Sequence, residues 1–90
     1  MRRASKVDAN QAGIVRALRQ VGCEVLDLHT VGAGCADLLV RDKACRLYLM
    51  EVKTAKHRRY TPQQKRFHAR WPVVTVSTEA EALAVIWFHN

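Results

Sequence analysis

Residues 36–53 read ADLLVRDKACRLYLMEVK, two apolar runs joined by the polar segment DKAC. This pattern predicts a β-hairpin. If the loop contains three residues, Asp42 faces Arg46 and Asp37 faces Glu51. The turn then gains an ion pair across the strands, and two carboxylates meet on one face of the sheet. A slip of one residue would separate them, because it turns the side chains of one strand to the opposite face.

Glu51 and Lys53 lie two residues apart, so their side chains project from the same face of the second strand, roughly 7 Å apart. Like charges directly opposite each other destabilise a sheet, but a divalent cation with oxygen ligands turns that repulsion into a binding site. We therefore predict that Asp37 and Glu51 bind a metal ion, with the main-chain carbonyl of Val52 as a third ligand. Lys53 would activate the attacking water or stabilise the charge of the transition state. The alternative is an exposed hairpin with an ordinary surface ion pair, against which the apolar residues 47–50 argue.

The chain has 90 residues, with 15 Lys and Arg against eight Asp and Glu, and a formal charge of +7. We expect a single domain over residues 1–90, with residues 1–7 as a flexible basic tail. The positive charge favours a polyanion such as nucleic acid as the partner; a merely basic surface is the alternative. Three cysteines without a close pair argue against disulfides and for a reducing, intracellular location. No apolar run is long enough to cross a membrane.

The remaining elements follow from capping signals and periodicity. Strand 46–53 is apolar on both faces, which predicts a central strand that is buried on each side. Trp71, Trp87 and Phe88 are interpreted as core or interface residues, with base stacking as the alternative. The predicted order is αβββαβα: a helix capped by Asp8 and ended by Gly22, strands 23–30, 36–41 and 46–53, a helix from Thr61 to Trp71, strand 73–76, and a helix capped by Thr78.

A basic loop follows the second hairpin strand, and the helix after it continues the positive charge. Gln64 and His68 lie one turn apart in that helix, so both could face the same cleft. Glycines 32 and 34 would let a DNA backbone approach Asp37, or would simply form a turn. We expect phosphate contacts from the basic side chains, with a solvated loop as the alternative; the residues are Lys56, Arg58, Arg59, Lys65 and Arg66.

These motifs resemble one family when they are taken in order and at this spacing. Gly34-x-x-Asp37-Leu-Leu-Val, Glu51-Val-Lys53 and Thr61-Pro-x-Gln64 resemble the VRR-NUC branch of the PD-(D/E)XK nucleases, in particular its small stand-alone, phage-type members. The resemblance implies a restriction-endonuclease-like α/β fold, with a mixed four-stranded sheet flanked by helices. It also implies dependence on Mg²⁺ or Mn²⁺ and a homodimer that acts on branched DNA such as four-way junctions.

By the same resemblance Asp37 and Glu51 are metal ligands, Lys53 is the catalytic lysine and Gln64 an auxiliary glutamine. Two positions depart from the family pattern. Ala36 stands where the superfamily has proline, and the first helix offers Asn10 where a glutamate often faces the metal, so a second metal ion is in question. Asn10 and His68 are candidate auxiliary residues.

The sequence therefore predicts a metal-dependent, structure-selective DNA endonuclease. Three alternatives remain at this point. The first is a nucleic-acid-binding module of the same fold without catalysis, which the amide of Asn10 favours and the intact Asp37, Glu51 and Lys53 oppose. The second is a nickase of simple duplex DNA, and the third is a nuclease that acts mainly on RNA.

Overall fold

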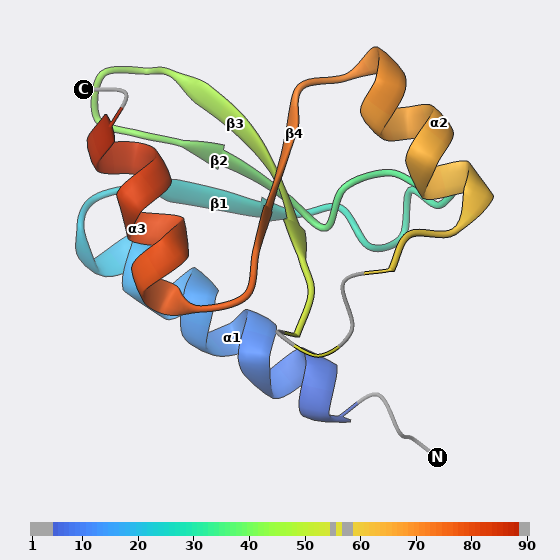
Figure 1. The fold of residues 1–90 in the computed structure, drawn as a ribbon. Coiled ribbons are helices and arrows are strands. Elements are labelled where there is room, and N and C mark those ends of the chain that lie inside the picture. The colour runs from blue at the N-terminus through green and yellow to red at the C-terminus, as the bar shows by residue number, and fades with distance from the viewer. Residues whose placement is uncertain (1–4, 55, 57–58, 89–90) are drawn as a thin grey trace.

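The elements of the chain follow the predicted order αβββαβα (Figure 1). The computed structural model describes residues 5–54, 56 and 59–88, with side chains from residue 10 onward. The helices and strands are α1 (Ser5–Gln20), β1 (Glu24–Asp27), β2 (Leu38–Arg41), β3 (Leu47–Val52), α2 (Pro62–Arg70), β4 (Val73–Val76) and α3 (Glu79–Phe88).

The four strands form one mixed sheet in the order β1-β2-β3-β4, which confirms the predicted fold class. The pairs β1–β2 and β2–β3 are antiparallel, and β3–β4 is parallel. In the β2–β3 ladder Leu38 pairs with Met50 and Arg41 with Leu47. Continued by one residue, this register places Asp37 opposite Glu51, as the sequence predicts.

The hairpin turn is held by the buried carboxylate of Asp42, which is only 1% exposed. It accepts hydrogen bonds from the main-chain N–H groups of Ala44 and Arg46, at 2.8 and 3.0 Å, and from the Tyr48 hydroxyl at 2.7 Å. Burial opposes ionisation of this carboxyl, but these hydrogen bonds and the charge of Arg46 outweigh burial and hold the pKa of Asp42 below its ordinary value. The turn thus fixes the register of the hairpin from the end that lies farthest from Glu51.

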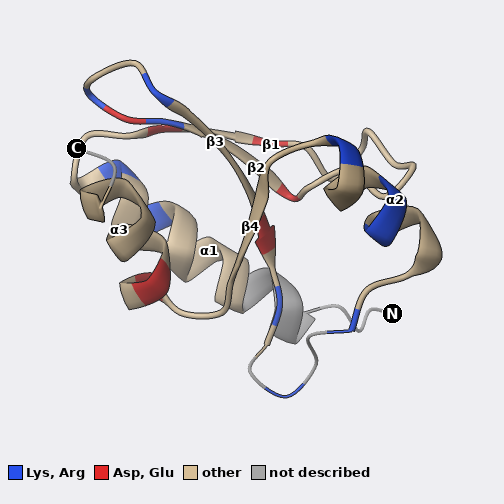
Figure 2. Cartoon of the chain, turned by 45° about the horizontal axis from the view of Figure 1, so that its top comes forward, with Lys and Arg blue, Asp and Glu red and all other residues tan. Residues whose placement is uncertain are grey.

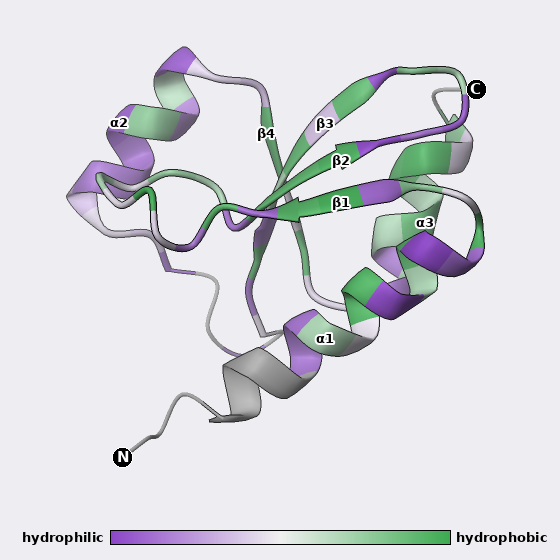
Figure 3. Cartoon of the chain, turned by 180° about the vertical axis from the view of Figure 1, so that it is seen from behind, coloured by the Kyte–Doolittle hydropathy of each residue, from purple (hydrophilic) through white to green (hydrophobic). Residues whose placement is uncertain are grey.

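The hydrophobic core lies on one face of the sheet only. Helices α1 and α3 lie together on that side, whereas α2 lies apart at the other end of the strands (Figures 1 and 2). Figure 3 shows the contrast in hydropathy: the strands are mainly hydrophobic and α2 mainly hydrophilic. The core cluster consists of Ile14, Leu18, Cys23, Leu38, Val40, Met50, Val52, Val76, Ala82 and Ile86.

The opposite face of the sheet is divided into an apolar part and a polar part. The register places Leu26, Leu39, Leu49 and Val73 side by side on this face, and Leu47 adjoins them. Leu26 is 58% and Leu47 65% exposed, so the prediction that strand 46–53 is buried on each side is wrong for its first half. We call these five residues the apolar patch.

Two further predictions are corrected by the structure. Helix α1 begins at Ser5, so Asp8 lies inside the helix and does not cap it, and residues 5–7 of the expected tail are helical; residues 1–4 lie outside the described part of the chain. Trp71, Trp87 and Phe88 are 54%, 62% and 86% exposed, so none of them is a core residue. Gly22 does end α1: its φ is +94°, and the N–H of Cys23 donates to the Leu18 carbonyl, as in a Schellman motif.

No helix in the described part of the chain is both long enough and apolar enough to span a membrane.

Candidate active site

A hollow of about 440 Å³ lies where the polar part of the open face meets helices α1 and α2. Its lining comes from three elements, α1, β3 and α2, and from segments next to β2 and β3, and it includes every residue that the sequence singles out for the centre of the site. The lining residues are Asn10, Asp37, Glu51, Val52, Lys53, Thr54 and Gln64.

Asp37 is tied to the neighbouring strand by its own carboxylate. Its Oδ2 atom accepts a hydrogen bond of 2.8 Å from the main-chain N–H of Val52. The N–H and C=O of one strand residue point to the same side, so the Val52 carbonyl is expected on the side of β3 that faces β2. The next residue turns the other way, because the N–H of Lys53 donates to the Val76 carbonyl of β4.

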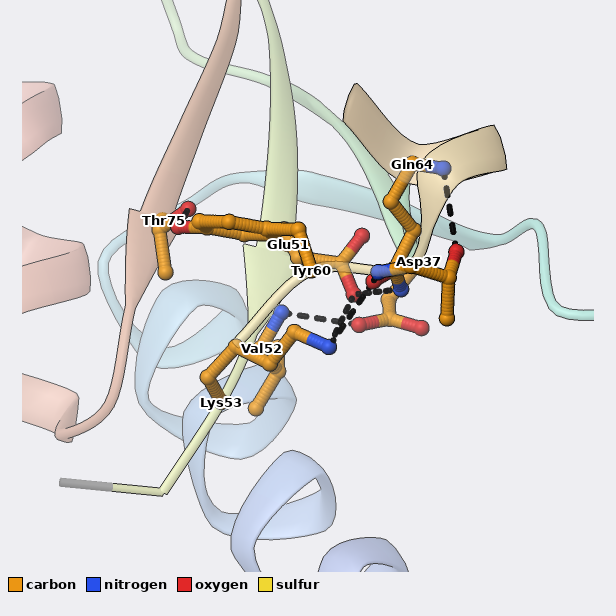
Figure 4. A network of polar contacts seen from close by, with 8 residues as sticks. Asp37, Glu51, Val52, Lys53, Tyr60, Gln64 and Thr75 are labelled. Carbon is orange, nitrogen blue, oxygen red and sulfur yellow. Dashed lines mark hydrogen bonds and ion pairs between the residues drawn. The ribbon is translucent and has the colours of Figure 1, made fainter. Parts of the chain in front are cut away.

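Gln64 joins the other two central side chains (Figure 4). Its Nε2 donates to Glu51 Oε2 at 3.1 Å, and its Oε1 accepts from Lys53 Nζ at 3.1 Å. The Lys53 ammonium lies 3.8 Å from Glu51 Oε2. The same Oε1 atom accepts from the Thr61 N–H and completes a capping box at the start of α2. The Gln64 side chain therefore belongs to the helix cap and to the site at once.

Gly34 lets the first turn of α2 come this close. Its φ is +78°, and a Cβ atom there would lie 2.4 Å from the carbonyl carbon and oxygen of Gln63 and 2.7 Å from the nitrogen of Gln64. The space beside Gly34 is thus filled by helix α2 and does not serve the approach of a DNA backbone. Gly32 has nearly the same φ, +76°, but no atom within 4 Å of its added Cβ.

The environment of Glu51 favours its neutral form. Its side chain is 3% exposed; this burial, together with the negative charge of Asp37, raises the pKa of Glu51 to about 7, although the charge of Lys53 acts in the opposite direction. Its second oxygen, Oε1, is buried and has no hydrogen-bond partner among the described residues.

These features fit a divalent cation. A buried acceptor oxygen without a donor, next to a second carboxylate and a main-chain carbonyl, is the arrangement that a hard cation would satisfy. The described residues contain no group of three or more His, Cys, Asp or Glu side chains placed to bind a metal. Such a cation would therefore keep several waters among its ligands, as Mg²⁺ commonly does.

The sequence offered no motif for a further residue, Tyr60, which packs beside the site. Its hydroxyl lies within hydrogen-bond distance of Thr75 Oγ1 on β4, and Lys53 Nζ lies 5.5 Å from the centre of its ring. The ring of His68 packs against Tyr60 at 4.9 Å between centroids. His68 does not line the hollow; burial, and then the charge of Lys53, lower its pKa. The one available signal for Tyr60 is an aromatic residue at the end of a basic run.

The basic residues predicted to contact DNA belong to the loop after β3 and to α2. Lys56, Arg59, Lys65 and Arg66 are exposed, and Figure 2 shows the positive charge of α2. Arg58 lies outside the described residues.

Replacing Gly34 by alanine should separate helix α2 from the site. We expect Gly32→Ala to destabilise the protein by about 1–2 kcal/mol, the usual cost of a left-handed conformation for a residue with a Cβ. Gly34→Ala adds the clash with the Gln63 backbone, so it should lower the free energy of unfolding clearly more than Gly32→Ala does. Urea unfolding of both variants measures the difference, and equal losses would contradict the close packing at Gly34.

Replacing Glu51 by glutamine should stabilise the metal-free protein at neutral pH. A raised pKa means that the folded state binds the proton more tightly, so wild-type stability falls as pH rises from about 4.5 to about 7. Glutamine does not titrate, so Glu51→Gln does not lose stability over this pH range. It should melt several degrees above the wild type at pH 8, and the difference should vanish below pH 4.5. Thermal unfolding in a chelating buffer measures it; a constant difference across the pH range would contradict the raised pKa.

Comparison with known proteins identifies the fold of the chain. No family model matches the sequence. No curated protein sequence matches it either. A solved structure described as a VRR_NUC domain aligns with 92% of this chain and 96% of its own, with a TM-score of 0.75 and 22% sequence identity. The chain therefore has the fold of a VRR_NUC domain, and the resemblance indicated by its motifs is confirmed at the level of the fold.

Proposed function

We propose that this protein is a metal-dependent DNA endonuclease that hydrolyses phosphodiester bonds in branched DNA such as four-way junctions. The observation that carries the proposal is the pair of Asp37, which is half-buried, and Glu51, which is buried, with Lys53 and Gln64 hydrogen-bonded to each other beside it. The likeness in fold to a VRR_NUC domain supports it, as does the formal charge of +7.

Asp37, Glu51 and the Val52 carbonyl would hold the cation, Mg²⁺ or Mn²⁺. When bound, it would polarise and position the attacking water, lower its pKa relative to bulk water, and neutralise charge on the phosphoryl oxygens. Asn10 lines the same hollow and can donate or accept a hydrogen bond there, but its amide brings no negative charge. Two carboxylates balance the charge of one divalent ion, so we infer one ion for each site.

Lys53 would provide the positive charge nearest the reacting phosphate. Gln64 restrains its ammonium on one side, and the Tyr60 ring lies on another. A charged donor held in place stabilises charge that develops in the transition state without having to reorganise. We therefore assign Lys53 to the phosphoryl oxygens or the attacking water, and Gln64 and Tyr60 to the positioning of Lys53.

The exposed cations would bind the DNA backbone around the cleaved bond. Lys56 and Arg59 belong to the loop after β3, and Lys65 and Arg66 to α2. Contacts of this kind position a duplex without reading its sequence. They suit an enzyme that selects DNA by its shape.

We also propose that two copies form the functional unit. The apolar patch leaves Leu26 and Leu47 largely exposed on the open face, and a domain of this size gains stability by covering such a surface. The patch shares its face with the polar part that carries Glu51. A dimer built across it would present two sites to two strands of a junction.

A catalytically inactive DNA-binding module of the same fold is the second candidate. The observation that favours it is the neutral Asn10 in the hollow. A nickase of simple duplex DNA differs from the main proposal only in its substrate.

The test is cleavage of labelled four-way junction, flap, linear duplex, single-stranded DNA and RNA with Mg²⁺, Mn²⁺ or chelator. We expect metal-dependent cutting of the junction, and a loss of at least about a hundredfold in Lys53→Ala, as for other transition-state donors. Lys43→Ala removes the same charge from the distant hairpin turn and is the matched control. DNA affinity measured in chelator should be largely unchanged in both.

Equal rates for Lys53→Ala and the wild type would refute the assigned mechanism. If the folded protein binds the junction but cuts nothing with either metal, the binding module replaces the enzyme. Preferential nicking of linear duplex would support the nickase, and preferential cutting of RNA would redirect the proposal to that polymer.

The dimer is tested by sedimentation equilibrium of Leu47→Glu. Leu47→Glu places a carboxylate in the apolar patch, where formation of the dimer would bury it without a partner. Because this burial is costly, we expect the variant to be a folded monomer and the wild type to be a dimer. Trp87→Glu changes a side chain of similar exposure, 62% against 65%, on α3, and should remain dimeric. A monomeric wild type, or dissociation by Trp87→Glu alone, would contradict an interface at the patch.

A further inference from the structure

Helix α2 carries a stacked aromatic pair at its C-terminal end. The rings of Phe67 and Trp71, one helical turn apart, have centroids 5.8 Å apart and planes inclined by only 18°. Phe67 is half-buried and supports Trp71, yet Trp71 remains 54% exposed. A large aromatic ring is thus held in one orientation with much of its surface open to solvent, where a second planar group could stack on it.

The surroundings of this ring are positively charged. A hollow of about 280 Å³ lies beside it, and none of the residues that line it is acidic. Arg66 and Arg70 are both exposed, and α2 itself contains no Asp or Glu. Guanidinium groups without a neighbouring carboxylate are well suited to phosphate. The lining consists of Ala33, Gln63, Arg66, Phe67, Arg70 and Trp71.

An open ring next to two arginines matches the two parts of a nucleotide, a planar base and a phosphate. Stacking on an aromatic side chain requires a base with a free face, and a base in an intact duplex has both faces covered by its neighbours. The hollow is also close in size to the smallest ligand pockets, about 300 Å³. A single unpaired nucleotide fits these conditions.

The position on α2 relates this hollow to the active site. Gln64, which contacts Glu51 and Lys53, precedes Trp71 by seven residues, or roughly 10 Å along the helix axis. That length corresponds to about three nucleotides of stacked strand. We propose that the hollow at Arg66, Phe67, Arg70 and Trp71 binds an unpaired nucleotide of the DNA substrate, a few nucleotides from the phosphodiester at Lys53. This inference rests on the proposed function and narrows its substrate to DNA with an unpaired base near the cut.

A second copy of the chain is the other occupant to consider. The protein carries a formal charge of +7, and the hollow offers arginines without acidic partners. Pairing this surface with another copy would bring like charges together, whereas nucleic acid neutralises them. The charge pattern therefore favours DNA.

The first measurement uses the fluorescence of Trp71. The chain has two tryptophans, so Trp87→Phe leaves Trp71 as the sole tryptophan, and its emission is excited selectively over that of the tyrosines. The protein is titrated in chelator, which prevents cleavage, with oligothymidylate, an abasic strand of the same length and a duplex of the same length. We expect strong quenching by oligothymidylate and little by the abasic strand or the duplex, because only the first offers free base faces.

The second measurement compares affinities for a junction with unpaired bases at its centre, again in chelator. Trp71→Ala should weaken binding about five- to a hundredfold, the range of one aromatic–base stack. Trp87→Ala removes a ring of similar exposure from α3 and should bind like the wild type. The N–H of Trp71 donates to the Phe67 carbonyl through the main chain alone, so the alanine variant keeps this helix end; circular dichroism checks it.

The outcomes separate this inference from the proposed function. If the wild type binds DNA and cuts it but Trp71→Ala and Trp87→Ala bind equally, only the nucleotide site is refuted. Unquenched Trp71 fluorescence refutes it as well. If Trp71→Ala changes the sedimentation of the free protein and leaves DNA affinity unchanged, the surface is an interface between copies. If the wild type binds no DNA, the proposed function and the nucleotide site both fail.

Discussion

The hairpin register brings the carboxylates of Asp37 and Glu51 together at one end of the hairpin. The other contacts of the site act on the repulsion between them. One oxygen of Asp37 accepts a hydrogen bond from the Val52 N–H. One oxygen of Glu51 accepts a hydrogen bond from the Gln64 amide and lies near the Lys53 ammonium. The other Glu51 oxygen is buried without a donor. Protonation near neutral pH or a cation can relieve this arrangement, so the unfavourable electrostatics are what suit the fold to metal chemistry.

The register that creates this repulsion is secured at the far end of the hairpin. Asp42 accepts two main-chain hydrogen bonds across the turn and one from Tyr48, and a slip of one residue would break all three. The same slip would expose the core side chains of one of the two strands, either Val40 on β2 or Met50 on β3. Packing on one side of the sheet therefore determines which charges meet on the other.

The parts predicted from sequence are those with local causes. The hairpin register follows from turn length and apolar pattern, and Gln64, which the motif Thr61-Pro-x-Gln64 singles out, lines the hollow. The positions of Gly34 and Tyr60 depend on contacts between segments distant in the chain, which no local pattern encodes. The hydrophobicity of Trp71 predicts a place in the core or an interface, but helix α2 ends at Arg70 and leaves the Trp71 ring 54% exposed.

Helix α2 has no fully buried residue. It is held by the packing at Gly34, the polar contacts of its first turn and the contact of His68 with Tyr60. Because none of its residues is buried, releasing it exposes little apolar surface. Regions of this kind open with a free energy below that of global unfolding. Because Gln64 leaves with the helix, the remaining core can stay folded while Glu51 and Lys53 lose their shared partner. Local opening at α2 would thus disassemble the reactive centre while leaving the scaffold intact.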